Sequence, residues 1–190
     1  IFRALDATVD GGTIPKEFTR NAGKSTRWGF ELDGRVAATN NLTLSGSYQY
    51  VDAKFDDYSV QSNDAGRVAE AGCSEVVTVG DSTICQLVYD GNAPGRTPKH
   101  ALNLGANWTA PLSTNYDYYI DVNARYTGKR FADDANVVTL AAYWRTDLRV
   151  GIVSDQIEVM AYAQNLFDSE RITDGFLWFD YQTTSFQPSF

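Results

Sequence analysis

Two cysteines are the residues of this sequence best suited to covalent chemistry. Cys73 and Cys85 are the only cysteines among the 190 residues, and both lie in residues 56–99, which we predict to be the longest loop. A metal site normally needs four nitrogen or sulfur ligands, whereas two cysteines in an oxidising compartment favour a disulfide. Closing a loop of this size is worth on the order of 3 kcal/mol in the chain-entropy model. We therefore expect a Cys73–Cys85 disulfide and no metal site.

The other chemically useful side chains give weak signals. His100 is the only histidine, so any Ser-His-Asp or histidine–metal arrangement would need it. Because no accompanying motif is present, an ordinary residue at the rim of the fold is the simpler interpretation. Two acidic pairs, Asp56-Asp57 and Asp133-Asp134, could bind a hard cation through oxygen ligands, but solvated loop charge is the simpler interpretation. We expect neither enzymatic activity nor a cofactor.

Alternation with a period of two dominates the segments that position these residues. In residues 28–38 one face is apolar, with Trp28, Phe30 and Leu32, while the other includes Glu31 and Asp33. A period of two predicts β-strands. Residues 118–129 and 144–152 show the same division. Across the clear strands one face carries no charge, and this contrast is typical of a sheet whose apolar face meets lipid. The charged residues all fall on the opposite face: Arg27, Glu31, Asp33, Arg35, Asp121, Arg125, Arg145, Asp147, Arg149 and Glu158.

The order of strands and connections predicts an antiparallel up-and-down meander. Strands are expected near residues 1–7, 25–38, 42–55, 100–111, 117–129, 142–154 and 156–167. Long connections, at residues 8–24, 56–99, 130–141 and 168–190, alternate with short ones at residues 39–41, 112–116 and 154–155. Outer-membrane barrels combine short periplasmic turns with long external loops. Most of the strands also have the roughly 9–11 residues that a tilted membrane strand requires.

The alternation assigns side chains to lipid or to the inside of the barrel. A basic side chain facing the middle of the bilayer costs roughly 2–4 kcal/mol, so the charged parity must face inward. Residues predicted to face lipid include Leu102, Leu104, Ile120, Val122, Leu148 and Val150. Arg125, Arg145 and Arg149 should face inward with Asp147, either contacting an anionic substrate or forming an ion-pair network. Aromatic residues near the strand ends predict two interfacial girdles: Trp28, Tyr48, Tyr50, Tyr126 and Trp144 at the long-loop ends, and Trp108 and Tyr118 at the short-turn ends.

Composition excludes one class of partner. The net charge of −8 and the isoelectric point near 4.6 argue against a nucleic-acid surface, which would need basic clusters. A soluble β-sandwich remains an alternative, because its strands also alternate. Strand length, the asymmetry of the loops and the aromatic positions favour the membrane barrel.

Several segments resemble a known family. Residues 29–55, 94–108, 125–152 and 161–168 look like the C-terminal part of the barrel of a TonB-dependent outer-membrane receptor, in the family's order. The resemblance implies a 22-stranded barrel around an N-terminal plug, in the outer membrane of a Gram-negative bacterium. It also implies active uptake of a scarce nutrient, such as an iron–siderophore complex or another metal chelate, powered by the TonB system through the plug.

The resemblance also implies how much of such a receptor the chain represents. Residues 1–190 should be the C-terminal part of the barrel, without the plug and without the closing strand, because residues 168–190 alternate poorly. The inward residues Arg125, Arg145, Asp147 and Arg149 are weak candidates for contact with the substrate or the plug, and an ion-pair network inside the barrel is the simpler interpretation. The alternative is a self-contained small porin or adhesion-type barrel, since eight strands can close. Seven strands would instead leave the strands at residues 1–7 and 156–167 with open edges.

Overall fold

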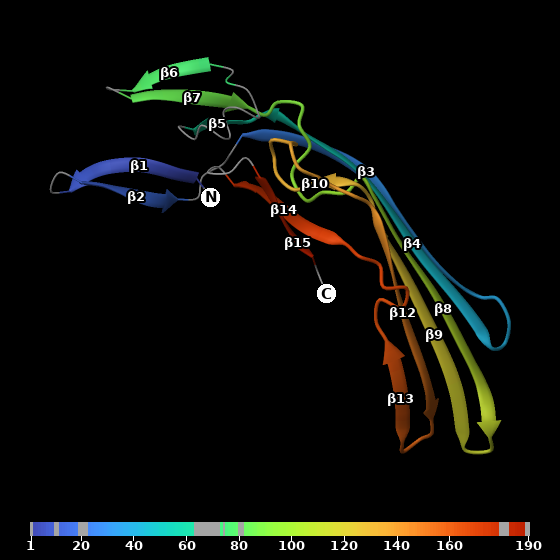
Figure 1. Ribbon diagram of the computed structural model, residues 1–190. Coiled ribbons are helices and arrows are strands. Elements are labelled where there is room, and N and C mark those ends of the chain that lie inside the picture. Colours follow the sequence, from blue (N-terminus) through green and yellow to red (C-terminus); the bar gives the residue numbers. More distant parts are fainter. Residues whose placement is uncertain are drawn as a thin grey trace.

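The chain is an all-β protein built around one long, curved antiparallel sheet (Figure 1). The computed structural model describes residues 2–9, 12–18, 23–62, 73, 75–79, 82–178 and 183–188. None of these residues belongs to a helix long and apolar enough to cross a membrane. The fold class predicted from the alternation is confirmed.

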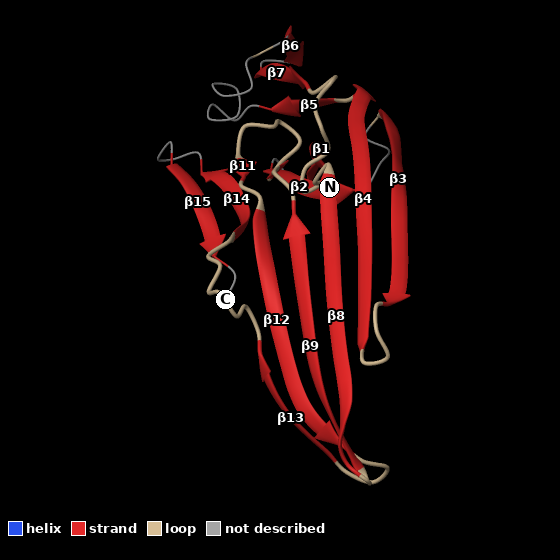
Figure 2. Cartoon of the chain, turned by 90° about the vertical axis from the view of Figure 1, so that its right-hand side faces the viewer, coloured by secondary structure: helices blue, strands red, loops and turns tan. Residues whose placement is uncertain are grey.

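Six strands form the main sheet, in the order β13-β12-β9-β8-β4-β3 (Figure 2). They are β3 (Lys24–Ala37), β4 (Leu42–Asp57), β8 (His100–Ser113), β9 (Tyr116–Thr127), β12 (Tyr143–Val153) and β13 (Glu158–Ala163). Every neighbouring pair is antiparallel. The connections β3–β4, β8–β9 and β12–β13 are short and lie at the lower end of the sheet in Figure 2. The alternation of short and long connections is therefore confirmed.

The remaining strands form small sheets at the long-loop end (Figures 1 and 2). They are β1 (Phe2–Val9) with β2 (Gly12–Phe18), β5 (Ser59–Ser62) with β7 (Ser82–Val88) and β6 (Glu75–Val79), β10 (Arg130–Phe131) with β11 (Thr139–Leu140), and β14 (Ile172–Trp178) with β15 (Thr183–Pro188). Backbone polar groups need hydrogen-bond partners, and long connections obtain them here by pairing with themselves.

Two expectations about these segments are wrong. The predicted strand at residues 1–7 is not an edge of the main sheet, because β1 pairs only with β2 in a separate hairpin. The predicted loops at residues 8–24, 56–99 and 168–190 contain β2, β5 to β7, and β14 with β15. The edges of the main sheet are consequently β3 and β13.

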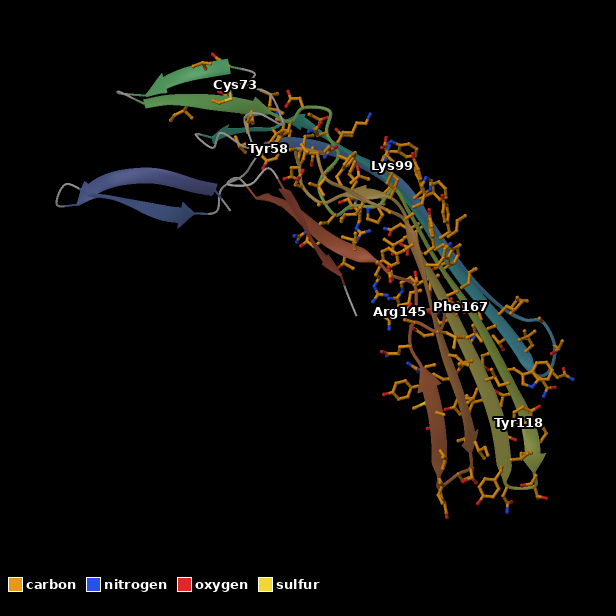
Figure 3. The ribbon with its side chains drawn as sticks, in the orientation of Figure 1. Tyr58, Cys73, Lys99, Tyr118, Arg145 and Phe167 are labelled. Carbon is orange, nitrogen blue, oxygen red and sulfur yellow. A yellow bond between two sulfur atoms is a disulfide. The ribbon has the colours of Figure 1, made fainter. Side chains whose placement is uncertain are left out.

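The register confirms which residues share a face. Leu104 lies opposite Ala124, and Val122 lies opposite Leu148, so the apolar parity is continuous across the sheet. Figure 3 shows Arg145 on the concave side of the sheet and Lys99 on the convex side. The apolar parity is therefore convex and open to lipid. Large apolar side chains on it are well exposed: Trp28 57%, Leu32 62% and Val36 58%.

Buried side chains gather at the long-loop end rather than under the main sheet. One cluster contains Tyr58, Cys85, Leu87 and Tyr89, and the other contains Ala132, Val138 and Leu140. The main sheet is a single layer with one lipid-facing and one polar face. Its strands are thus held by backbone pairing, while the small clusters fix the loops above it.

Candidate functional site

The concave face of β9 and β12 brings the predicted charged residues together. Arg145 is the register partner of Arg125, Asp147 of Asn123, and Arg149 of Asp121. Register partners in an antiparallel pair point to the same face and lie about 4.5–5.5 Å apart at Cβ. Arg125, Arg145, Asp147 and Arg149 thus form one inward wall, which we call the arginine wall.

Asp147 is the anchor of the arginine wall. Its Oδ1 accepts a hydrogen bond from Arg145 Nε at 2.9 Å and another from the backbone N–H of Asn165, also at 2.9 Å. Asn165 begins the turn after β13 and has φ 54°, a conformation that asparagine tolerates better than most residues. Asp147 thereby fixes both an arginine and the turn beside it, which is part of an ion-pair network.

Arg125 and Arg149 are the exposed members of the wall. Within the described part of the chain, neither forms an ion pair within 4.0 Å. Arg149 faces Asp121, whose Oδ1 instead accepts a hydrogen bond from Asn107 Nδ2 at 2.7 Å. The ion-pair interpretation therefore accounts for Arg145 and Asp147 and leaves two guanidinium groups open to whatever the concave face contacts.

A second cationic group lies directly above the wall, around Tyr143. The guanidinium carbon of Arg130 lies 5.6 Å from the centroid of the Tyr143 ring, and that of Arg171 lies 5.7 Å from it. Arg130 is 8% exposed and donates from Nη2 to the carbonyl oxygen of Thr173 at 3.2 Å. Sequence reasoning missed this group, although Tyr143 shares the parity of Arg145.

An interlocked pair of external loops closes the upper rim of the sheet. Asn136 Nδ2 donates to the Ala93 carbonyl at 2.7 Å, and Asn136 Oδ1 accepts from the Ala93 N–H at 2.9 Å. Asp134 Oδ1 accepts from the Gly95 N–H at 2.8 Å. Asp134 is thereby a structural residue of this clamp, and no group of three or more metal-ligating side chains occurs among the described residues.

Cys85 lies in β7, in the sheet of β5, β6 and β7, and Cys73 lies two residues before the start of β6. The structure joins Cys73 to Cys85 by a disulfide, with their Cα atoms 5.5 Å apart, well within the 4.4–6.8 Å that such bridges usually span. Cys85 is buried against Tyr58, Leu87 and Tyr89. The bridge staples an external arm and takes no part in the arginine wall.

The aromatic residues form a belt at each end of the convex face. At the long-loop end the ring centroids of Trp28 and Tyr50 lie 5.2 Å apart, and those of Tyr126 and Trp144 lie 5.1 Å apart. At the short-turn end Trp108 Nε1 donates to the Tyr118 hydroxyl at 3.4 Å. Tyrosine and tryptophan favour the boundary between hydrocarbon and water. Two membrane girdles explain this placement.

His100 belongs to the upper girdle rather than to a catalytic group. Its Nδ1 is hydrogen-bonded to the Tyr48 hydroxyl at 2.7 Å, and its ring contacts that of Tyr50 at 5.2 Å between centroids. Just above it, the Lys99 ammonium donates a hydrogen bond to the Asp52 carboxylate, which raises the pKa of Lys99. The convex face thus changes from aromatic to charged where the loops begin.

Comparison with known protein families identifies the family to which the chain belongs. The family model described as TonB dependent receptor-like, beta-barrel, matches residues 1–166. The chain belongs to the TonB-dependent receptor family. TonB-dependent receptors are transporters rather than enzymes and reside in the outer membrane of Gram-negative bacteria, which agrees with the convex lipid-facing side and its two aromatic girdles.

Individual TonB-dependent receptors match at low identity and over part of their length. The ferrichrome outer membrane transporter/phage receptor of Escherichia coli K12 is 27% identical over 169 residues, covering 84% of this chain and 18% of the relative. The ferrioxamine receptor of Yersinia enterocolitica is 26% identical over 142 residues, covering 75% of this chain and 16% of the relative. The chain therefore spans about a sixth of the length of these TonB-dependent receptors.

Solved structures share the fold. The siderophore receptor PiuA of Acinetobacter baumannii aligns with a TM-score of 0.61 at 20% identity, over 89% of this chain and 21% of that receptor. The ferric yersiniabactin uptake receptor FyuA of Yersinia pestis aligns with a TM-score of 0.65 at 17% identity, over 89% of this chain and 22% of that receptor. The curved sheet is thus an arc of a TonB-dependent receptor barrel.

Proposed function

We propose that the complete protein takes up a scarce nutrient, such as an iron–siderophore complex, using energy delivered by the TonB system. Family membership supports uptake across the outer membrane. The printed names of the relatives from Escherichia coli and Yersinia enterocolitica, a ferrichrome transporter and a ferrioxamine receptor, support a ferric chelate as cargo. The family match over residues 1–166 is the observation that carries the proposal.

We further propose that residues 1–190 are a C-terminal part of a larger barrel. All fourteen residues of β3 are exposed, as are most residues of β13. These are the two edges of an open sheet, and an unpaired edge is untenable in hydrocarbon. Further strands of the same receptor would cover both edges. This feature argues against the alternative of a self-contained small porin, in which the first and last strands would pair.

Uptake is tested in a Gram-negative host that lacks its own ferric-chelate receptors. The full-length gene should restore growth under iron limitation on at least one ferric chelate, and growth should disappear when the TonB system is deleted. Growth that persists without TonB would indicate passive diffusion and would support the porin alternative. A matched control is the same host with the empty vector, supplied with excess iron.

A further inference from the structure

The arginine wall contains an arrangement that costs stability. Arg125 and Arg145 are direct register partners on β9 and β12, and like charges directly opposite each other in an antiparallel pair are destabilising. A single carboxylate, that of Asp147, lies close enough to attract both guanidinium groups. Its Oδ1 is already occupied by Arg145 Nε and by the Asn165 N–H. Two guanidinium groups thus share one carboxylate, and these three side chains together carry a net positive charge.

Positive charge continues above this pair toward the external loops. Tyr143 lies two residues before Arg145 on the same face, and Arg130 and Arg171 both contact its ring. Arg130 Nη1 is buried and has no hydrogen-bond partner in the described structure. The Arg125–Arg145 pair and the group around Tyr143 above it are thus locally cationic in a chain whose net charge is −8. Such local excess attracts anions into a concave site.

We infer that Arg125 and Arg145 form a subsite for an anionic group of the imported ligand, and that the preferred ligand is a negatively charged chelate rather than an uncharged one. This inference rests on the proposed uptake function and names its substrate class. Guanidinium groups donate paired hydrogen bonds in a planar fork that matches carboxylate-like oxygens. Arg125 is exposed on the concave face and is the member free to turn toward a ligand, while Asp147 holds Arg145 in place.

The test measures equilibrium binding by the detergent-solubilised full-length receptor, which does not require TonB. Tryptophan fluorescence quenching is recorded with three probes: ferric dicitrate, an anionic ferric tris-catecholate and an uncharged ferric trihydroxamate. We expect an anionic probe to bind at least about tenfold more tightly than the uncharged one, a difference that one charge-assisted contact can supply. Its affinity should also fall as sodium chloride is raised, because salt screens exposed charges.

The substitution Arg125→Gln separates binding from folding. Removing one of two opposed like charges should leave the unfolding midpoint unchanged or higher, while the affinity for the anionic probe falls at least about tenfold. Arg125→Lys should restore part of the affinity, because it keeps the charge and loses the fork. Arg35→Gln is the matched control, since Arg35 lies on the same face of the distant strand β3, opposite Ser45, and should change affinity less than about twofold.

Three binding outcomes would overturn the inference. They are tighter binding of the uncharged probe, no binding of either anionic probe, and equal losses from Arg125→Gln and Arg35→Gln. A lower unfolding midpoint for Arg125→Gln would also overturn it, because Arg125 would then be a structural residue. Failure of the proposed function is distinguishable from failure of the subsite. If the receptor binds anionic chelates but supports no TonB-dependent growth, the subsite is supported and the proposed uptake function is contradicted.

Discussion

The Tyr48 hydroxyl and His100 Nδ1 lie 2.7 Å apart and join β4 to β8 on the convex face. Their rings are stacked, with centroids 6.1 Å apart, and His100 also contacts Tyr50. A histidine in this position has its polar edge satisfied by a phenol and its ring flanked by other rings. It behaves as an amphipathic girdle residue, with an apolar body and a polar tip, which is the property that suits tyrosine and tryptophan to the membrane boundary.

The first prediction separates the hydrogen bond of this pair from its ring contacts. Tyr48→Phe should lower the free energy of unfolding by about 1 kcal/mol, since a single neutral hydrogen bond contributes about that much. The loss should not be larger, because interfacial water can hydrogen-bond His100 in place of the missing hydroxyl. His100→Ala should cost more, about 2 kcal/mol, because two aromatic contacts of about 0.5–1.5 kcal/mol each are lost as well. Urea unfolding of the full-length receptor in lipid vesicles gives both values. Equal costs would mean that the ring contacts contribute nothing.

A second prediction tests the two faces of the sheet with the same residue. Leu104→Arg places a guanidinium on the convex face near the middle of β8 and should destabilise the barrel by about 2–4 kcal/mol. Ser47→Arg is the matched control on the concave face, where its register partners are Asp33 and Asn103, and should be nearly neutral. Assembly into outer membranes, scored by resistance to unfolding in SDS at room temperature, compares the two. Similar losses would contradict the face assignment.

The faces of the main sheet could be predicted from the sequence because one physical rule governs every strand residue. Arg125 and Arg145 share the charged parity of their strands, so the sequence predicts that they lie on the same face. Their direct pairing does not follow from the sequence, because a long connection, residues 128–142, joins β9 to β12. The strand at residues 1–7 was misplaced for the same reason. A short strand can be recognised from its residue types, but the sequence does not show that β1 pairs with β2 in a hairpin of its own rather than with the main sheet.

The rim contacts could not be predicted, because they depend on loops that meet across long sequence separations. Arg96 Nη2 donates a hydrogen bond to Asp174 Oδ2 at 2.6 Å, although the two residues are 78 positions apart in the sequence. Asn136 and Ala93, which are 43 positions apart, are also hydrogen-bonded. Neither contact follows from a period, since loop backbones have no repeating direction. The one available signal was the clustering of asparagine, aspartate and glycine in residues 90–96 and 133–136, which indicates turns without indicating partners.

A third prediction concerns the clamp between these loops. Asn136→Gly removes the side-chain hydrogen bonds to Ala93, Asp133 and Asp134. It adds no backbone strain, because Asn136 has φ 61° and glycine adopts a positive φ readily. Amides of residues 92–97 should exchange with deuterium faster, corresponding to a loss of about 1–3 kcal/mol of local stability. Asn136→Ala should exchange faster still, by the added strain of a left-handed alanine of about 1 kcal/mol. Unchanged exchange in both variants would show that the clamp is held elsewhere.

A fourth prediction concerns the external arm. Replacing Cys73 and Cys85 together by serine should loosen the sheet of β5, β6 and β7 by about 3 kcal/mol, because the open chain regains the entropy that a loop of this size loses. The main sheet should be unaffected, since β5, β6 and β7 form a separate sheet. Limited proteolysis should therefore cut within residues 59–88 of the variant or of the reduced protein, and spare the rest. Cutting of the main strands at the same rate would show that the arm supports the barrel.

The last prediction follows from the open edges of the main sheet. β3 has fourteen residues, all exposed, and no strand of the described structure pairs with its outer side. In lipid or detergent each unsatisfied backbone group costs several kcal/mol, and in water a bare edge beside an apolar face promotes aggregation. The 190-residue chain produced alone should therefore give oligomers or aggregates in size-exclusion chromatography with light scattering, whereas the full-length receptor should be monodisperse. A monomer that stays folded in SDS until heated would mean that β3 and β13 can meet in a narrow barrel, and would favour the small-porin alternative over an arc of a wider one.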